Sequence, residues 1–196
     1  VTNTKVLANP TEPENGEESR IIHSSVHMDG GRLTLNHSPV YGSILVEADV
    51  TLELGEGSNV ESEADNAITV KGKADITGCT VRGKQIGLLV TGGKKASAML
   101  HSGEVSGKEA GVLVDGGSFT MDGGTIYGAQ CGIHVGGTPK STVKISGGEI
   151  NADETALFAK QGSSVSLSGG TFTAGQNALA AGESTMKGWL AEGYDM

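Results

Sequence analysis

The side chains best placed for catalysis are two glutamates, Glu104 and Glu149, with Thr125 midway between them. If their segments stack as parallel strands ~4.8 Å apart, two steps separate the carboxylates by ~10 Å. Carboxylates that hold a water between them are the machinery of inverting glycoside hydrolases. No other acid joins them, and the five histidines form no HExxH pattern. We interpret both glutamates as solvated turn residues and predict no catalytic residue, metal ligand or cofactor.

Lysines and tyrosines offer binding chemistry instead. The segments GGKKAS (92–97) and GGTPKST (136–142) are basic within an acidic chain. Variable loops on a rigid scaffold often carry recognition, so Lys94, Lys95 and Lys140 are candidate partner contacts, although neutral insertions would look the same. Aromatic and guanidinium groups also suit protein or sugar contacts. Tyr41, Arg82 and Tyr127 share one recurring position, but three repeats separate the tyrosines, too far to grip one small sugar.

Composition excludes several classes of protein. The 196 residues carry a formal net charge of −9, which repels a phosphate backbone and argues against nucleic-acid binding. The sequence contains no run of 18 apolar residues, so we expect no membrane insertion. Two cysteines, Cys79 and Cys131, are too few for a disulfide-built fold, and we interpret them as small apolar fillers. The chain starts at Val1 without a recognisable signal peptide, so we expect a processed protein or a fragment.

The elements that must position these residues follow from internal repetition. Apolar residues recur every 20 to 24 positions in three parallel columns. The columns are Leu35, Ile76, Leu100, Met121, Ile145 and Leu167; Val40, Val60, Val81, Val105, Ile126, Ile150 and Phe172; and Ile44, Ile68, Leu88, Val112, Ile133, Leu157 and Leu179. Each lies in a short segment rich in Val, Ile and Thr, which indicates a strand. Three strands per repeat predict an all-β, single-stranded parallel β-helix (solenoid) of about seven coils.

Glycines and the chain ends complete the domain organisation. Pairs such as Gly123-Gly124 separate two strands of one coil, where a sharp bend favours positive φ. Residues 1–22 are polar and predict an N-terminal arm or linker, followed by the β-helix over 23–183. Residues 184–196 break the repeat and predict a short helical cap, in which Trp189 closes the open end of the core.

One outward column is unexpectedly apolar. Along the last strand of each repeat, alternation points the middle residue away from the core. That position reads Leu45, Thr69, Leu89, Leu113, His134, Phe158 and Ala180. A contiguous apolar stripe on a surface usually marks a contact site. The N-terminal arm, a partner or a second copy of the chain could each cover it, so Leu45, Leu89, Leu113, His134 and Phe158 are candidate partner-binding residues and a homo-oligomer is possible.

The repeat also resembles a known group. Tandem GG-x-I turns followed by G-[IV]-x-V, and closed by MKGWLAEGYDM, resemble right-handed, pectate-lyase-like β-helix regions of cell-surface proteins of gut Firmicutes. The similarity spans about 24–194. It implies a right-handed coil and a secreted or wall-displayed module. We expect a non-enzymatic adhesion module that docks a host protein, for example immunoglobulin, or a glycan. The alternatives are a polysaccharide lyase or hydrolase and a purely structural stalk.

Overall fold

Three parallel sheets wind into one right-handed solenoid, as the repeat predicts. The structure is a computed structural model and describes residues 22, 25–136, 140–181 and 188–190. Sheet B contains β1 (Val26–Met28), β4 (Ile44–Val46), β7 (Asn66–Val70), β10 (Ile86–Thr91), β13 (Ala110–Asp115), β16 (Cys131–Val135), β19 (Thr155–Ala159) and β22 (Asn177–Ala181). Sheet C contains β2 (Arg32–Leu35), β5 (Thr51–Leu54), β8 (Lys73–Ile76), β11 (Ser97–Leu100), β14 (Gly117–Met121), β17 (Ser141–Ile145) and β20 (Ser164–Leu167). Sheet A contains β3 (Pro39–Tyr41), β6 (Asn59–Ser62), β9 (Cys79–Gly83), β12 (Gly103–Gly107), β15 (Thr125–Gly128), β18 (Glu149–Ala152) and β21 (Thr171–Ala174).

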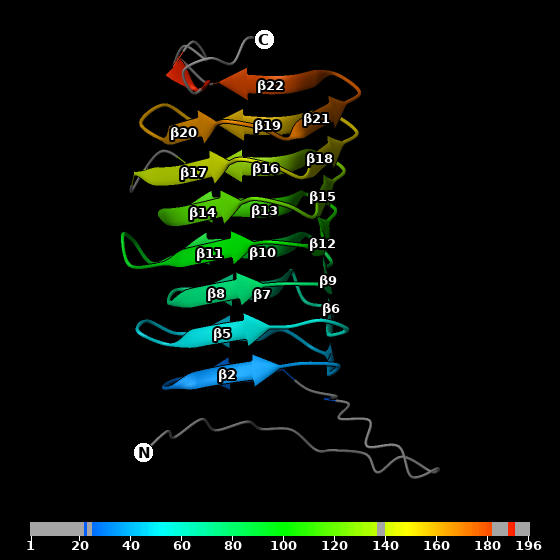
Figure 1. Ribbon diagram of the computed structural model, residues 1–196, viewed down its shortest axis with the longest axis vertical. Coiled ribbons are helices and arrows are strands. Elements are labelled where there is room, and N and C mark those ends of the chain that lie inside the picture. Colours follow the sequence, from blue (N-terminus) through cyan, green and yellow to red (C-terminus); the bar gives the residue numbers. More distant parts are fainter. Residues whose placement is uncertain (1–21, 23–24, 137–139, 182–187, 191–196) are drawn as a thin grey trace.

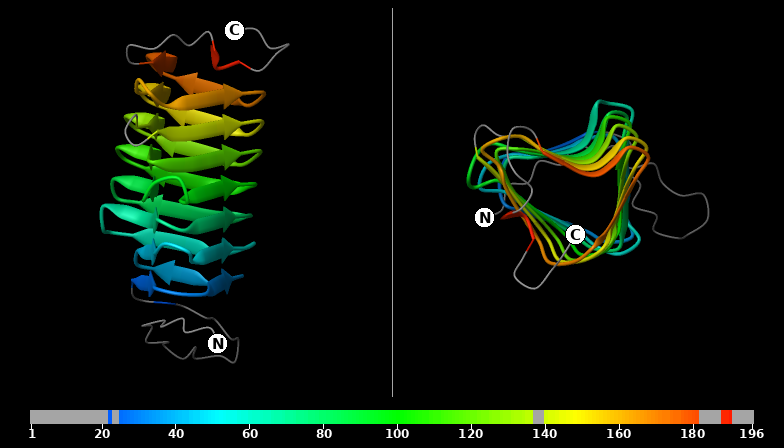
Figure 2. Two further views of the ribbon diagram at one scale, coloured as in Figure 1. Left: turned by 90° about the vertical axis from the view of Figure 1, so that its left-hand side faces the viewer. Right: turned by 90° about the horizontal axis from the view of Figure 1, so that it is seen from above.

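The chain visits the sheets in the order B, C, A and then returns to B one coil further on. Strands that follow each other along a wall are therefore about one repeat apart in sequence, and every pair within the sheets is parallel. Figure 1 shows the coils stacked along the long axis, and the view from above in Figure 2 shows the three walls around a common interior.

The register confirms the three apolar columns. Val40 pairs with Val60, Ile44 with Ile68 and Leu100 with Met121, and the remaining members continue these ladders. Most are fully buried, and each such side chain contributes ~1.5–3 kcal/mol to folding. The structure adds Leu54, which fills the gap between Leu35 and Ile76 in the sheet C column, and Val26, which begins the sheet B column.

Glycines serve two geometric purposes at the corners. In the Gly-Gly pairs the second glycine has positive φ, as expected: 83° at Gly124 and 89° at Gly148. Gly111, at the start of the sheet B strand, has no such φ but lies against the wall of the next coil. A Cβ there would lie 2.7 Å from the Tyr127 carbonyl oxygen and closer still to the Ile126 side chain. The small residue is therefore required by close packing.

Both chain ends are described only in part. Ile22 forms a parallel bridge with Val40, so its backbone extends sheet A by one position. The rest of the predicted arm, over 1–21, lies outside the described residues. At the other end Trp189 is 7% exposed and joins the core, and the Leu167 N–H donates to its carbonyl at 2.6 Å. This agrees with Trp189 closing the core; most of the predicted cap (182–187 and 191–196) lies outside the described residues.

The cysteines are free and buried, in agreement with a packing role. Burial raises the pKa of the Cys79 thiol to about 12 and that of Cys131 to about 11, so both stay protonated at neutral pH. In the described part of the chain, no helix is long and apolar enough to cross a membrane.

The close approach at Gly111 generates a stability prediction. Gly111→Ala should lower the free energy of unfolding by ~1–3 kcal/mol, because the new methyl group overpacks the contact with Ile126 and Tyr127. Chemical denaturation followed by circular dichroism measures the change. Ser166→Ala, an equally small change on the exposed face of β20, should stay within ~0.5 kcal/mol of the parent. Equal stability of Gly111→Ala and the parent would show that the corner is looser than described.

Candidate functional site

The apolar column predicted on the outside of sheet B is continuous in the structure. We call it the sheet-B ladder; its rungs are His27, Leu45, Thr69, Leu89, Leu113, His134, Phe158 and Ala180. The strands place each rung from His27 to Phe158 between two buried core residues, as in β10, where Leu88 and Val90 are buried and Leu89 is not. Alternation thus sends the rungs outward while their neighbours fill the core.

The rungs from Leu45 to Ala180 are half-buried. Since successive strands are ~4.8 Å apart, each side chain covers part of the next, and the ladder shields itself. The large hydrophobic residues classed as exposed among the described residues are Tyr41 and Tyr127, on a different wall. The sheet-B ladder is therefore a flat, close-packed apolar strip rather than a row of projecting side chains.

His134 is the polar exception in the ladder. Its ring packs edge-on against Phe158, with centroids 5.2 Å apart and planes at 86°. Its Nε2 is buried and has no hydrogen-bond partner in the described structure. Desolvation, and secondarily the charge of Lys160, lower the pKa of His134, so the ring is neutral at pH 7. An unsatisfied ring nitrogen here costs stability, and no feature of the fold compensates for it.

A second apolar column, which the sequence did not indicate, lies beside the sheet-B ladder. Ile86, Ala110 and Cys131 stack in register with Asn66, at the beginning of the sheet B strands. They are buried but lie outside the contiguous core. The Asn66 side chain donates to Thr69, a rung of the ladder, at 3.4 Å, which places this second column beside the first. Sequence reasoning missed this second column because the alternation of inward and outward side chains breaks at the small residue that follows each of its members.

Sheet A carries the tyrosine and arginine candidates. Tyr41, Arg82 and Tyr127 lie in one register column, with Glu61 and Ser106 between them. Four steps separate the tyrosines, or ~19 Å, so they do not form one site. The Tyr127 hydroxyl donates to both carboxylate oxygens of Asp153 at 3.0 Å. That hydrogen bond, with a smaller effect from desolvation and the Asp153 charge, raises the pKa of Tyr127.

The two glutamates with catalytic potential do flank Thr125 in the register. Glu104, however, lies 3.5 Å from Arg82, which compensates its charge. Glu149 is an exposed residue at the start of β18. The arrangement supports the interpretation of both as solvated residues.

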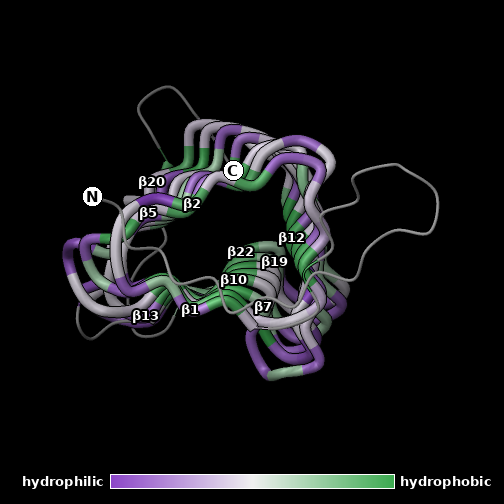
Figure 3. The backbone as a smooth tube through the Cα atoms, turned by 90° about the horizontal axis from the view of Figure 1, so that it is seen from below, coloured by the Kyte–Doolittle hydropathy of each residue, from purple (hydrophilic) through white to green (hydrophobic). Residues whose placement is uncertain are grey.

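The predicted basic loops lie on one edge of the solenoid, where sheet B turns into sheet C. Lys94 and Lys95 follow β10, and Lys140 precedes β17 two coils further on; residues 137–139 are outside the description. On this B–C edge lysines outnumber acidic residues. The lysines are Lys71, Lys73, Lys94, Lys95, Lys140 and Lys160, and the acidic residues are Asp29, Glu47, Asp49 and Asp115. On the A–B edge acids dominate instead. Figure 3 shows hydrophilic residues at the corners of the coil.

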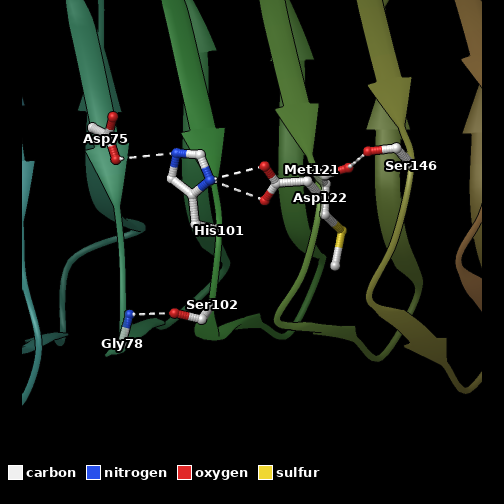
Figure 4. A network of polar contacts seen from close by, with 7 residues as sticks. All are labelled: Asp75, Gly78, His101, Ser102, Met121, Asp122 and Ser146. Carbon is white, nitrogen blue, oxygen red and sulfur yellow. Dashed lines mark hydrogen bonds and ion pairs between the residues drawn. The ribbon is translucent and has the colours of Figure 1, made fainter.

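Sheet C carries a polar network that sequence reasoning missed. The His101 Nδ1 lies 2.9 Å from an oxygen of Asp122, and its Nε2 lies 3.6 Å from Asp75 (Figure 4). Asp75 escaped notice because it contacts His101 diagonally, two positions off the register. The two nitrogens face different carboxylates, so the network links three coils. Among the described residues, no group of three or more His, Cys, Asp or Glu side chains is placed to hold a metal ion.

The candidate residues thus form three separate surfaces: the sheet-B ladder, the sheet A face and the B–C edge. Comparison of the chain with protein-family models, with curated proteins and with solved structures returned no match. The functional argument therefore depends on the chemistry of these surfaces.

The Tyr127–Asp153 contact predicts a shifted titration. Tyr127 should lose its proton above its ordinary pKa of 10.0, because the phenolate would repel the Asp153 carboxylate. Ultraviolet difference titration of the parent against Tyr127→Phe isolates this phenol. Asp153→Asn should move the titration back toward the ordinary value; an unchanged curve in that variant would mean that the hydrogen bond is not formed in solution.

The unsatisfied ring nitrogen of His134 predicts that replacing this residue stabilises the protein. His134→Leu should raise the free energy of unfolding by ~1 kcal/mol at pH 7, because it removes an unsatisfied buried nitrogen and continues the leucine ladder. The folded-state pKa is lowered, so the parent should lose stability as the pH falls below the ordinary value of 6.5, and the variant should lose less. Urea denaturation at pH 7 and pH 5.5 measures both. A destabilised variant would contradict the assignment.

Proposed function

We propose that this protein is a non-enzymatic binding module that docks another protein on the outer face of sheet B. The observation that carries the proposal is the sheet-B ladder, in which four of the six rungs from Leu45 to Phe158 are leucine or phenylalanine; Thr69 and the neutral His134 are the other two. Flat apolar strips of this kind are uncommon on protein surfaces that contact only water. The ladder would form the apolar centre of the interface.

The chemistry of the ladder favours a protein over a glycan. Sugars are recognised through many hydrogen bonds, and the rungs from Leu45 to Ala180 offer only the Thr69 hydroxyl and the His134 ring nitrogens. Leucine and phenylalanine side chains instead match the apolar groups at the centre of protein interfaces. Five steps of ~4.8 Å separate Leu45 from Phe158, which gives the strip a length of ~24 Å.

The solenoid itself supports this role. Backbone hydrogen bonds join each rung to the next, so the strip is held flat before a partner arrives and little ordering is required on binding. Its resemblance to β-helix regions of gut-bacterial surface proteins fits a secreted or wall-displayed module that meets a host protein. A purely structural stalk would not need the apolar ladder. A polysaccharide-active enzyme would need carboxylates whose charge is not compensated as that of Glu104 is by Arg82.

The experiment is a pull-down from serum and mucus, followed by a binding assay with the purified captured protein. Leu89→Thr combined with Leu113→Thr should weaken that binding at least ~100-fold, because two central apolar contacts are lost. Threonine is chosen because Thr69 already occupies the same ladder, so the fold should survive. Unfolding curves confirm that the variant is folded.

Met99→Thr provides the matched control, since Met99 is a half-buried apolar residue on the outer face of sheet C. Its binding should equal that of the parent. If Leu89→Thr/Leu113→Thr binds as tightly as the parent, the sheet-B ladder is not the docking surface. If neither fluid yields a partner and light scattering shows a concentration-independent monomer, the stalk is the better description.

A further inference from the structure

A hollow on the B–C edge gathers positive charge. It has a volume of about 550 Å³ and is lined by Asp49, Val50, Thr51, Gly72, Lys73, Lys94, Lys95 and Ser97. Three of these side chains are lysines, in a protein whose formal net charge is −9. Its size falls within the range of small-molecule sites. The hollow is separate from the outer face of sheet B, so it does not depend on the proposed protein partner.

The backbone around the hollow is fixed by hydrogen bonds between coils. The Lys73 N–H donates to the Val50 carbonyl at 2.8 Å, and the Ser97 N–H donates to the Gly72 carbonyl at 2.9 Å. Lys94 and Lys95 are the central residues of a turn closed by the Ala96 N–H and the Gly93 carbonyl at 3.0 Å. Ala96 is fully buried and anchors that turn. The backbone from which the lysine side chains project is therefore set before any ligand arrives.

The charge of the hollow is only partly compensated. Lys95 lies 3.2 Å from Asp49, but both side chains are largely exposed, 80% and 76%, so this pair contributes little. Lys73 and Lys94 form no ion pair with any described residue, whereas the neighbouring Lys71 is held by Glu47 at 3.1 Å. Two ammonium groups thus border the hollow without a carboxylate of their own. Such a pair attracts an oxyanion.

We propose that this hollow binds a saccharide unit that carries a sulfate or phosphate ester. Lys73 and Lys94 would hold the ester oxygens, with the Thr51 and Ser97 hydroxyls as further donors. The volume exceeds that of a bare oxyanion, and the remaining wall offers the Asp49 carboxylate for sugar hydroxyls. The proposal goes beyond docking of a protein on sheet B and does not require it.

The test is a nuclear magnetic resonance titration of the parent protein with glucose 6-sulfate and glucose 6-phosphate. Backbone amides of Gly72, Gly93 and Ser97 should shift in a saturable manner with either ester. Glucose without an ester, and inorganic sulfate or phosphate alone, should each bind at least tenfold more weakly. The two esters together distinguish a preference for sulfate from one for phosphate. Higher salt should weaken binding, since the lysines are exposed.

Lys73→Gln combined with Lys94→Gln should weaken binding of the preferred ester about tenfold. Lys108→Gln combined with Lys144→Gln removes the same charge elsewhere and should change the affinity less than twofold. Equal losses in both double variants would overturn the proposal, since the attraction would then reflect net charge alone. No saturable shift with either ester, or equal affinity for the inorganic anions, would overturn it as well.

Discussion

Each coil is held to the next by parallel backbone hydrogen bonds on three walls, and this stacking constrains everything else in the structure. A coil of three short strands cannot bury its own apolar side chains; only a neighbour at ~4.8 Å completes the core. Equivalent residues must therefore lie above one another. The corners must admit the close approach seen at Gly111 and the positive φ seen at Gly124.

The same constraint turns a repeated sequence into surfaces. A position that is apolar in several repeats becomes a continuous strip, as on sheet B, and a turn that is basic in several repeats becomes a charged edge. The strip and the hollow beside Lys73 and Lys94 offer two different kinds of chemistry on one rigid body: apolar contact for a protein, and paired ammonium groups for an oxyanion.

The sequence was sufficient for the fold because period and register coincide. The alignment of Val40, Val60 and Val81 predicts the order of strands in all three sheets. The structure adds Leu54 and Val26 to the columns, and isolated bridges add Ile22 and Leu190 at their ends. The surfaces were less predictable. Alternation identified the outward rungs from Leu45 to Phe158, but it failed where the chain bends, so Ile86 was missed. Contacts that cross the register, such as Asp75 with His101, and the hollow formed by turns of different coils, cannot be derived from columns.

The central claim is that the outer face of sheet B is the surface another protein meets. Hydroxyl-radical footprinting of the protein, alone and with its purified partner, tests it most directly. The account predicts that oxidation of Leu89, Leu113 and Phe158 falls on complex formation while that of Tyr41 and Tyr127 is unchanged. Protection of the sheet A tyrosines, with the sheet-B ladder as reactive as in the free protein, would contradict it.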